Sequence, residues 1–353
     1  MITVNRSNLA KAWGLTGQVA GVQSTLSAIR GIRIGRDAYD ESIELSATDL
    51  TMSIRMLVKV APNGVDAPVI MSVKDFGNVL NAIPTSVVFM STGGSKIINH
   101  CTTVLSYVGG EIKIAATDDK DFPTLPPFLG HDANWATIPL DDFRRMIKMT
   151  VVAAGKDDGR PVLQSVLITY APIVDDSHLG LLKFAATDGY RLAIASAQID
   201  CWTGYWSMLV PDSTLRMLSK IAFYADPKQF SVSIDDIAKR ATFRFIGKEG
   251  APYIETQLTT MLIDGKFPDT DAILKQAQRA NVQATVSKMQ LQQELRIAAC
   301  FASEQYSVVK MIVGQGKITL KTSSVIGEYF GEMGIEGGGA TPLEVSLGVR
   351  LFR

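Results

Sequence analysis

Hydrophobic and polar positions along the chain follow two periods, and the order of these periods repeats. Apolar residues at helical spacing predict amphipathic helices that begin near residues 5, 139 and 287. A second helix is predicted in the first two units, at 72–83 and 211–223. Most of the remaining chain alternates with a period of two, which is typical of short strands, as in QFSVSI, ATFRFI and GKITLKT.

Two short sequences occur twice, in the same order and at a similar offset. IELSATDLTMSI (43–54) and LKFAATDGYRLAI (182–194) each place Ala-Thr-Asp between two alternating runs. DKDFPTLP (119–126) is echoed by DGKFPDTD (264–271). Repeats this long, with mixed strands and two helices, are not solenoid motifs. We therefore predict tandem α+β domains of one fold, with their helices presented in the same way.

The predicted domains span residues 1–134, 135–281 and 282–353. The third is about half as long as the others and stops within an apolar pattern, so we expect it to be partial. Within the second domain, Asp188 and Gly189 form a good tight-turn pair between two alternating runs, which predicts a hairpin.

The predicted helices carry lysine and arginine away from their apolar stripes. On any single helix, an ordinary solvated face explains these cations. Their recurrence on equivalent helices favours one shared basic surface that contacts phosphates without reading bases. The cations assigned to this surface are Arg6, Lys11, Lys74, Arg144, Arg145, Lys148, Arg216, Lys220 and Arg296.

Composition limits the class of protein without identifying a partner. The chain has 353 residues, is 46% hydrophobic, and balances 35 basic against 35 acidic residues. Net charge therefore gives no hint of a polyanion partner, although a local basic surface remains compatible with it. No apolar run is long enough to cross a membrane and no signal-peptide pattern opens the chain, so we expect a cytoplasmic protein with no membrane partner.

Cysteine and histidine are too scattered for a metal site or a disulfide framework. Cys101, Cys201 and Cys300 lie far apart, as do the three histidines. A dyad of His100 and Cys101 is disfavoured, since neighbours on a strand point to opposite faces. We expect no cofactor and no catalytic residues.

Four segments resemble the bacterial DNA polymerase III β subunit family, the sliding clamps. AATDGYRLA (185–193) is similar to the family's signature strand-turn-strand, although the family usually has histidine where Tyr190 stands. IDGKFPDTDAIL (263–274) and DKDFPTLP (119–126) resemble the segments that close its second and first domains. LSATDLTMSI (45–54) resembles the first domain's Ala-Thr-Asp strand. The likeness runs in order from the amino terminus to about residue 350.

The resemblance implies the DNA clamp fold, in which helices line a central hole and antiparallel sheets lie outside. It implies a head-to-tail homodimer whose ring encircles double-stranded DNA and tethers a polymerase without catalysis. The implied partners are a DNA polymerase subunit, an ATP-driven clamp loader and other clamp-motif proteins. These proteins would insert a short hydrophobic motif, usually led by glutamine, into one pocket.

The pocket residues are carried over from the resemblance one at a time. Thr187, Gly189, Tyr190, Arg191 and Leu192 match its turn side, and Leu163 and Arg160 match the adjoining wall. Pro268 and Ile273 match the remaining wall of the second domain. The family's last wall, a carboxyl-terminal tail, has no counterpart in this sequence. Gln23 stands where the family commonly has a DNA-contacting arginine, for which Arg30 or Arg33 would have to compensate.

Two other classes of protein share single features with this sequence. Asp118, Asp119 and Asp121 resemble a metal-binding cluster, but no histidine or glutamate cluster accompanies them, so an enzyme is disfavoured. The glycine-rich stretch 334–342 lacks the spacing of a phosphate-binding loop. The alternative is a β-rich structural or binding protein without a DNA function.

Overall fold

The computed structural model describes residues 2–36, 42–61, 67–97, 100–156, 159–173, 176–200, 202, 204–225, 227–249, 251, 253–280, 282–301 and 308–348. Cys201 lies outside the described residues. The chain separates into two compact units, residues 1–267 and 268–353, and each is described by itself.

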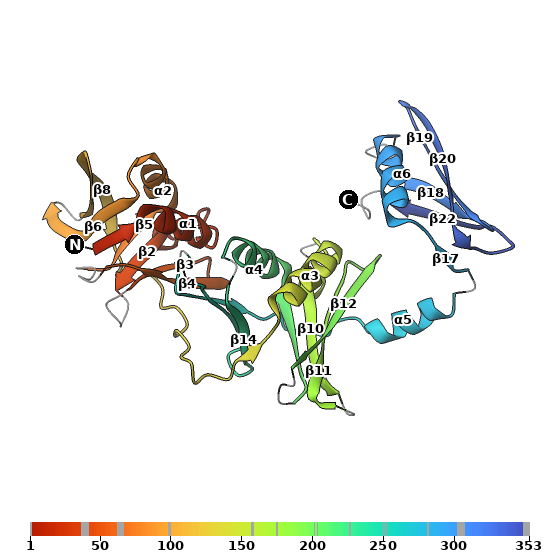
Figure 1. Ribbon diagram of the computed structural model, residues 1–353, viewed down its shortest axis with the longest axis horizontal. Helices are drawn as coiled ribbons and strands as arrows, with labels where there is room; N and C mark the ends of the chain where they lie inside the picture. The colour runs from red at the N-terminus through yellow and green to blue at the C-terminus, as the bar shows by residue number, and fades with distance from the viewer. Residues whose placement is uncertain are drawn as a thin grey trace. The chain divides into compact units, whose positions relative to one another are not determined.

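The first half of unit 1 alternates strands with two helices (Figure 1). Its elements are β1 (Ile2–Asn5), α1 (Arg6–Thr16), η1 (Ser27–Arg30), β2 (Gly31–Arg36), β3 (Ser42–Thr48), β4 (Met52–Lys59), β5 (Val69–Ser72), α2 (Val73–Ala82), β6 (Val87–Ile97), β7 (His100–Tyr107) and β8 (Gly110–Asp118).

The second half of unit 1 repeats this order. Its elements are β9 (Ala136–Thr137), α3 (Leu140–Thr150), η2 (Val151–Ala153), η3 (Pro161–Gln164), β10 (Ser165–Ile173), β11 (Asp176–Thr187), β12 (Leu192–Asp200), β13 (Trp206–Pro211), α4 (Asp212–Ala225), β14 (Gln229–Asp235), β15 (Arg240–Ile246) and β16 (Glu255–Met261).

Unit 2 contains α5 (Thr270–Gln278), β17 (Ala284–Thr285), α6 (Lys288–Phe301), β18 (Val308–Val313), β19 (Lys317–Ser324), β20 (Gly327–Gly334), β21 (Glu336–Gly337) and β22 (Leu343–Gly348). The five helices predicted from the sequence are confirmed as α1, α2, α3, α4 and α6. Helix α5 was not predicted. The α+β class is confirmed, whereas the domain limits near 134 and 281 stay predictions.

The sheets are antiparallel throughout the described residues. In unit 1, twelve strands join in the order β1-β6-β7-β8-β5-β2-β3-β4-β16-β15-β14-β9, and a second sheet has the order β12-β11-β10-β13. The long sheet passes from one repeat to the next where β4 pairs with β16, from Met52 opposite Thr260 to Leu57 opposite Glu255. In unit 2, the main sheet has the order β20-β19-β18-β22.

The helices of unit 1 pack on the sheets through aromatic side chains. Trp13 of α1 meets Phe76 of α2 edge to face at 4.5 Å and donates its indole N–H to the Val73 carbonyl at 2.9 Å. Phe143 of α3 lies 4.1 Å from Phe230 of β14 and 6.0 Å from Phe184 of β11, measured between ring centroids. Helix α3 thus joins both sheets of its repeat in one buried core.

Unit 2 has a smaller core of its own, in which α6 buries Leu295 and Ala298 against Val309, Leu320 and Met333 of the sheet. The Tyr329 hydroxyl of β20 donates to the Glu294 carboxylate of α6. Burial, together with this neighbouring carboxylate, raises the pKa of Tyr329 to about 12.

A connecting segment, residues 119–135, runs between the two repeats across the sheet face opposite the helices. Arg55, Gln257 and Arg244 lie side by side on β4, β16 and β15, and their side chains alternate with core residues, so they point to this outer face. Gln257 exchanges two hydrogen bonds with the Leu129 backbone, of 2.9 and 2.7 Å.

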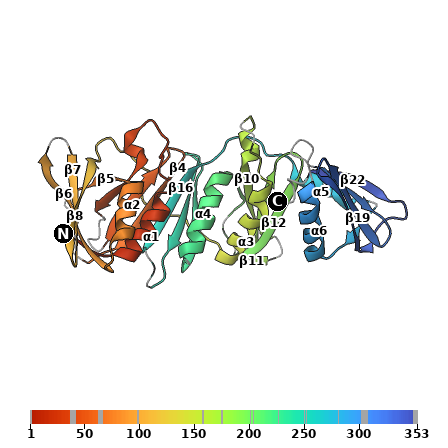
Figure 2. The ribbon, with the colours of Figure 1, turned by 90° about the horizontal axis from the view of Figure 1, so that it is seen from above.

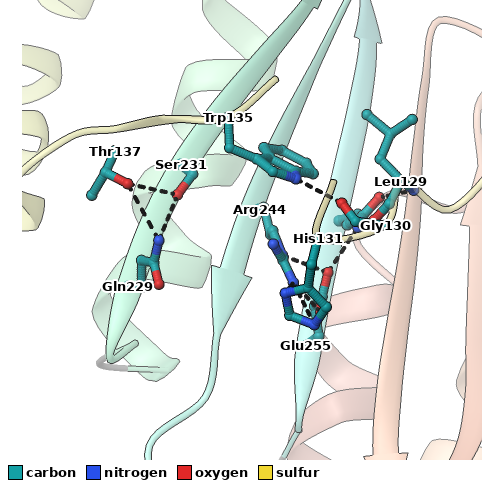
Figure 3. Close-up of polar contacts among 10 residues, drawn as sticks. Leu129, Gly130, His131, Trp135, Thr137, Gln229, Ser231, Arg244 and Glu255 are labelled. Carbon is teal, nitrogen blue, oxygen red and sulfur yellow. Dashed lines mark hydrogen bonds and ion pairs between the residues drawn. The ribbon is translucent and has the colours of Figure 1, made fainter. Parts of the chain in front are cut away.

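Two arginines hold the connecting segment, one near its middle and one at its carboxyl-terminal end. Arg55 lies over the Phe128 ring at 5.4 Å and pairs with Glu44 at 2.6 Å. Arg244 lies over the Trp135 ring at 5.2 Å and pairs with Glu255 at 2.7 Å. Figure 3 shows Trp135 and His131 on either side of Arg244, whose Nη2 lies 2.9 Å from the His131 Nδ1. The segment therefore fastens the two repeats of unit 1 to each other.

Candidate nucleic-acid and peptide interfaces

The four helices of unit 1 lie on one side of its sheets. Figures 1 and 2 show α2, α1, α4 and α3 in a row on this face, with the strands behind them. The apolar stripes cause this arrangement, because Leu9, Phe76, Phe143 and Leu218 are fully buried on the sheet side. The expectation that repeated domains present their helices alike is confirmed for unit 1.

Most of the predicted surface cations are exposed on these helices. Lys11, Lys74, Arg145, Lys148, Arg216 and Lys220 are exposed, whereas Arg6 and Arg144 are half-buried. Lys220 of α4 donates to the Gln18 side chain, which follows α1, at 2.8 Å. Arg296 is exposed on α6 of unit 2, so it is described apart from the others.

Two of these cations also hold the helices together. The Arg6 guanidinium donates to the Leu80 carbonyl of α2 at 3.1 Å. Arg144 of α3 donates to the Ala222 carbonyl of α4 and lies 3.4 Å from Asp141. The sequence pattern predicted a cationic face, but it did not predict which arginines reach a neighbouring helix.

The three cations of α3 divide between two sides of that helix. Arg144 and Lys148 line a groove between α3 and α4 together with Arg216. Arg145 instead pairs with Asp142 at 2.9 Å and donates to the Ser196 carbonyl of β12 at 3.0 Å. The three side chains therefore do not form one cluster, although all three belong to the helix face of unit 1.

Gln23 stands where the family has a DNA-contacting arginine, and Arg30 and Arg33 are the cations that could compensate for it. These three residues lie in different places. Gln23 is exposed in the loop after α1, and Arg30 is exposed and donates to the Ser24 carbonyl at 2.6 Å. Arg33 pairs with Asp119 of the connecting segment at 2.8 Å, on the face opposite the helices. Arg33 consequently does not replace the missing cation on the helix face.

The predicted hairpin at Asp188 is confirmed. Strands β11 and β12 pair from Leu179 opposite Asp200 to Thr187 opposite Leu192, which leaves residues 188–191 as the turn. The Thr187 hydroxyl donates to the Arg191 carbonyl at 2.7 Å and accepts from the Gly189 N–H at 3.0 Å. Gly189 has a φ of +92°, a conformation that glycine adopts without strain.

The first repeat closes its Ala-Thr-Asp hairpin with the same hydrogen bonds. The Thr48 hydroxyl donates to the Met52 carbonyl at 2.8 Å and accepts from the Leu50 N–H at 3.0 Å. The Asp49 carboxylate accepts from the backbone of Thr51 and Met52, as Asp188 does from Tyr190 and Arg191. Thr and Asp are therefore repeated because they close this turn.

The carboxylate of Asp188 is the electrostatic centre of the hairpin. Partial burial raises its pKa. The opposing effect is larger, because the carboxylate accepts from the N–H groups of Tyr190 and Arg191 and lies 3.0 Å from the Arg191 guanidinium, so the net shift of the pKa is downward. A lowered pKa in the folded state means that this carboxylate stabilises the hairpin above its unfolded pKa. The contribution is lost as pH falls through the folded value.

Replacing Asp188 by alanine is expected to destabilise unit 1 by about 1–2 kcal/mol at pH 7, because two backbone N–H groups and one arginine lose their acceptor. The loss should begin to shrink below the ordinary aspartate pKa of about 3.9 and should vanish only below the lowered pKa of the folded state. Urea unfolding over a series of pH values from 7 downward measures this dependence. A loss that stays constant across the series would contradict this role of the charge.

The predicted pocket residues belong to both units, and those of each unit are described by themselves. Tyr190 is exposed to 88%, Leu192 is half-buried, and a Cβ built on Gly189 would lie 3.8 Å from the Arg160 guanidinium. Leu163 is half-buried on η3, beside Gly155. Pro268 and Ile273 are exposed in unit 2, and Ile273 belongs to α5. The pocket as a whole stays a prediction.

The acidic residues considered for catalysis have other partners. Asp118 pairs with Lys120 at 2.9 Å, and Asp119 pairs with Arg33. Among the described residues, no group of three or more His, Cys, Asp or Glu side chains is placed to hold a metal ion. None of the helices in the described part of the chain is long and apolar enough to cross a membrane.

Comparisons with known proteins agree on one family. Residues 137–269 match the family described as DNA polymerase III beta subunit, central domain. The beta sliding clamp of Bacillus subtilis (strain 168) is 23% identical over 318 residues, which cover 88% of this chain and 76% of that protein. The beta sliding clamp of Rickettsia felis is 23% identical over 334 residues, covering 94% and 79% respectively.

Solved structures show the same fold. A DNA polymerase sliding clamp from Bacillus subtilis has a TM-score of 0.82 at 20% identity, covering 99% of this chain and 87% of that chain. A putative DNA polymerase III beta subunit from Eubacterium rectale has a TM-score of 0.83 at 18% identity, covering 99% and 88%.

Proposed function

We propose that this chain, which resembles the β sliding clamps, is a DNA sliding clamp, a non-catalytic processivity factor that encircles double-stranded DNA and tethers the replicative polymerase. The observation that carries this proposal is the common helix face of unit 1. Two successive repeats present four helices on it, and exposed cations lie on each.

The chemistry of this face suits a protein that slides along its nucleic-acid partner. Lysine and arginine side chains contact phosphates through charge, and phosphates recur identically at every step of a duplex. Contacts of equal energy at each position hold the protein on DNA without fixing its register. The equal numbers of acidic and basic residues leave no general attraction to nucleic acid elsewhere on the chain.

The remaining parts of the proposal rest on the resemblance to the sliding clamps. The ring is a homodimer of chains with domains at 1–134, 135–281 and 282–353, opened by a clamp loader. Lys11, Lys74 and Lys220 face the hole, as do the other cations assigned to the helices. The protein acts in the cytoplasm, where replication takes place.

Association with duplex DNA that is independent of sequence tests this function. Two 30-base-pair duplexes of unrelated sequence should bind with affinities within about two-fold of each other, and log K should fall linearly with log salt concentration. Fluorescence anisotropy over a salt series measures both. A strong preference for one sequence, or no binding to either at low salt, would reject the proposal.

We also propose that the hairpin at 187–192 forms one wall of the partner-peptide pocket. Leu192 and Leu163 are half-buried, so each leaves apolar surface for a leucine or phenylalanine anchor, worth roughly 1.5–3 kcal/mol on burial. Two or three such anchors, less the cost of ordering the peptide, give about micromolar affinity. That affinity lets polymerase, loader and other clamp-motif proteins exchange.

Leu192→Ala is expected to weaken binding of a glutamine-led hydrophobic peptide by about ten-fold, since part of the apolar wall is removed. Val108→Ala is the matched control, because Val108 is 83% exposed on a different hairpin. Isothermal titration measures both variants, and circular dichroism confirms that they remain folded. Unchanged affinity for Leu192→Ala would remove the hairpin from the pocket.

A further inference from the structure

The groove between α3 and α4 combines cations with an exposed aromatic ring. Helices α3 and α4 lie side by side on the helix face of unit 1 (Figure 2). The groove encloses about 390 Å³, which is within the range of small-ligand sites. Its lining includes the cations Arg144, Lys148 and Arg216 and the apolar side chains of Val151, Val152 and Phe223.

None of the described residues that line this groove is acidic, so their side chains contribute charge of one sign. Arg216 of α4 pairs with Asp212 of its own helix at 3.0 Å and reaches across to the Val151 carbonyl of η2 at 3.3 Å. Arg144 of α3 reaches across in the other direction to the Ala222 carbonyl of α4. Two guanidinium groups are thereby fixed across the groove, and the exposed Lys148 adds a third cation.

The apolar part of the groove is unusual for a surface that contacts only a duplex backbone. Phe223 is 76% exposed and Val152 is 53% exposed, although both lie beside the buried Val151. Phosphates and sugars gain little from a phenyl ring. The flat face of a nucleobase gains stacking energy, but in a duplex both faces of each base are already covered by their neighbours.

We propose that the α3–α4 groove binds an unpaired nucleotide of single-stranded DNA, with the base stacked on Phe223 and its phosphates held by Lys148, Arg216 and Arg144. The proposal rests on the sliding-clamp function for the placement of this face toward DNA. The site would then engage the unpaired strand where duplex DNA ends at a junction or gap, in addition to the duplex contacts made by the other cations.

The proposal separates phosphate recognition from base recognition, so three probes test it in the full chain. These are a labelled dT12 strand, an abasic strand of the same length, and a blunt 20-base-pair duplex. Phe223→Ala should weaken binding of dT12 by roughly five-fold or more, because one stacked base is lost. Binding of the abasic strand and of the duplex should stay within about two-fold of wild type.

The controls keep this result specific. Phe223→Trp should retain the affinity for dT12, since tryptophan offers a larger face for stacking. Tyr205→Ala should change nothing, because Tyr205 is equally an exposed aromatic (69%) but lies outside the groove. A Phe223→Ala effect of the same size on the abasic strand, or no effect on dT12, would overturn the site. Failure of the duplex to bind wild-type protein would instead reject the sliding-clamp function.

Discussion

Reversing the three cations of α3 together, as Arg144→Glu, Arg145→Glu and Lys148→Glu, is expected to reduce duplex affinity by about 100-fold or more near 0.1 M salt. Each phosphate contact that is lost removes the entropy of one released counterion, and the new carboxylates repel the backbone. The slope of log K against log salt should fall in magnitude by about 2.7, since each contact contributes about 0.9.

Anisotropy titrations of a 30-base-pair duplex at several salt concentrations measure both effects. The matched control reverses Lys59, Lys113 and Lys120, which are exposed and lie outside the four helices. This control changes the net charge equally, so it separates a local contact from general repulsion. Equal losses in the two triple variants would mean that α3 does not face the duplex.

Glu255→Ala is expected to lower the free energy of unfolding of unit 1 by about 3–5 kcal/mol. The substitution leaves Arg244, whose side chain is only 5% exposed, as a buried charge without its carboxylate. It also removes the acceptor of a 2.7 Å hydrogen bond from the Gln257 side chain, which binds the connecting segment. The substitution therefore also weakens the contact between β16 and the connecting segment, which joins the two repeats.

Glu44→Ala is the matched control for this prediction. Glu44 pairs with Arg55 in the same way, but that arginine is 25% exposed and water can solvate it. We therefore expect a smaller loss, of about 1–2 kcal/mol. Urea unfolding followed by circular dichroism compares the two variants. A Glu255→Ala loss no larger than that of Glu44→Ala would show that burial of the Arg244 pair is not what stabilises this junction.

The helices were the most predictable part of the fold, because their apolar residues have a clear period and settle on one core. Phe143, Ile147 and Thr150 are all buried as that period requires. Helix α5 was missed, although Asp269 accepts hydrogen bonds from the Asp271 and Ala272 N–H groups as a helix N-cap. Its apolar residues Ile273 and Leu274 are exposed, so no buried stripe marked it.

The continuous sheet of unit 1 could not be predicted from local pattern. Strands β4 and β16 are about 200 residues apart in the chain, and their alternation shows which faces are buried but not which strands pair. Arg55 and Gln257 face each other only because the two repeats meet at this edge. The role of Trp135 over Arg244 depends on the same long-range contact.

The sequence predicted which helices carry the candidate DNA-facing residues, but it did not predict where each of their side chains points. A cation on a polar face can reach solvent or a neighbouring carbonyl, and sequence does not distinguish the two outcomes. Lys148 reaches solvent, whereas Arg6 donates to Leu80 of the next helix. Phe223 was grouped with an ordinary amphipathic helix, because its exposure depends on how α3 packs beside α4.

The most direct test of the sliding-clamp account asks whether the protein is held on DNA by topology. Linear duplex is fixed to beads at one end, the protein is allowed to thread onto it, and the free end is then left open or blocked by a bound antibody. After a wash in about 0.5 M salt, which weakens phosphate contacts, the account predicts retention only on blocked DNA, with release when the duplex is cut. Equal retention or equal loss on open and blocked DNA would contradict it.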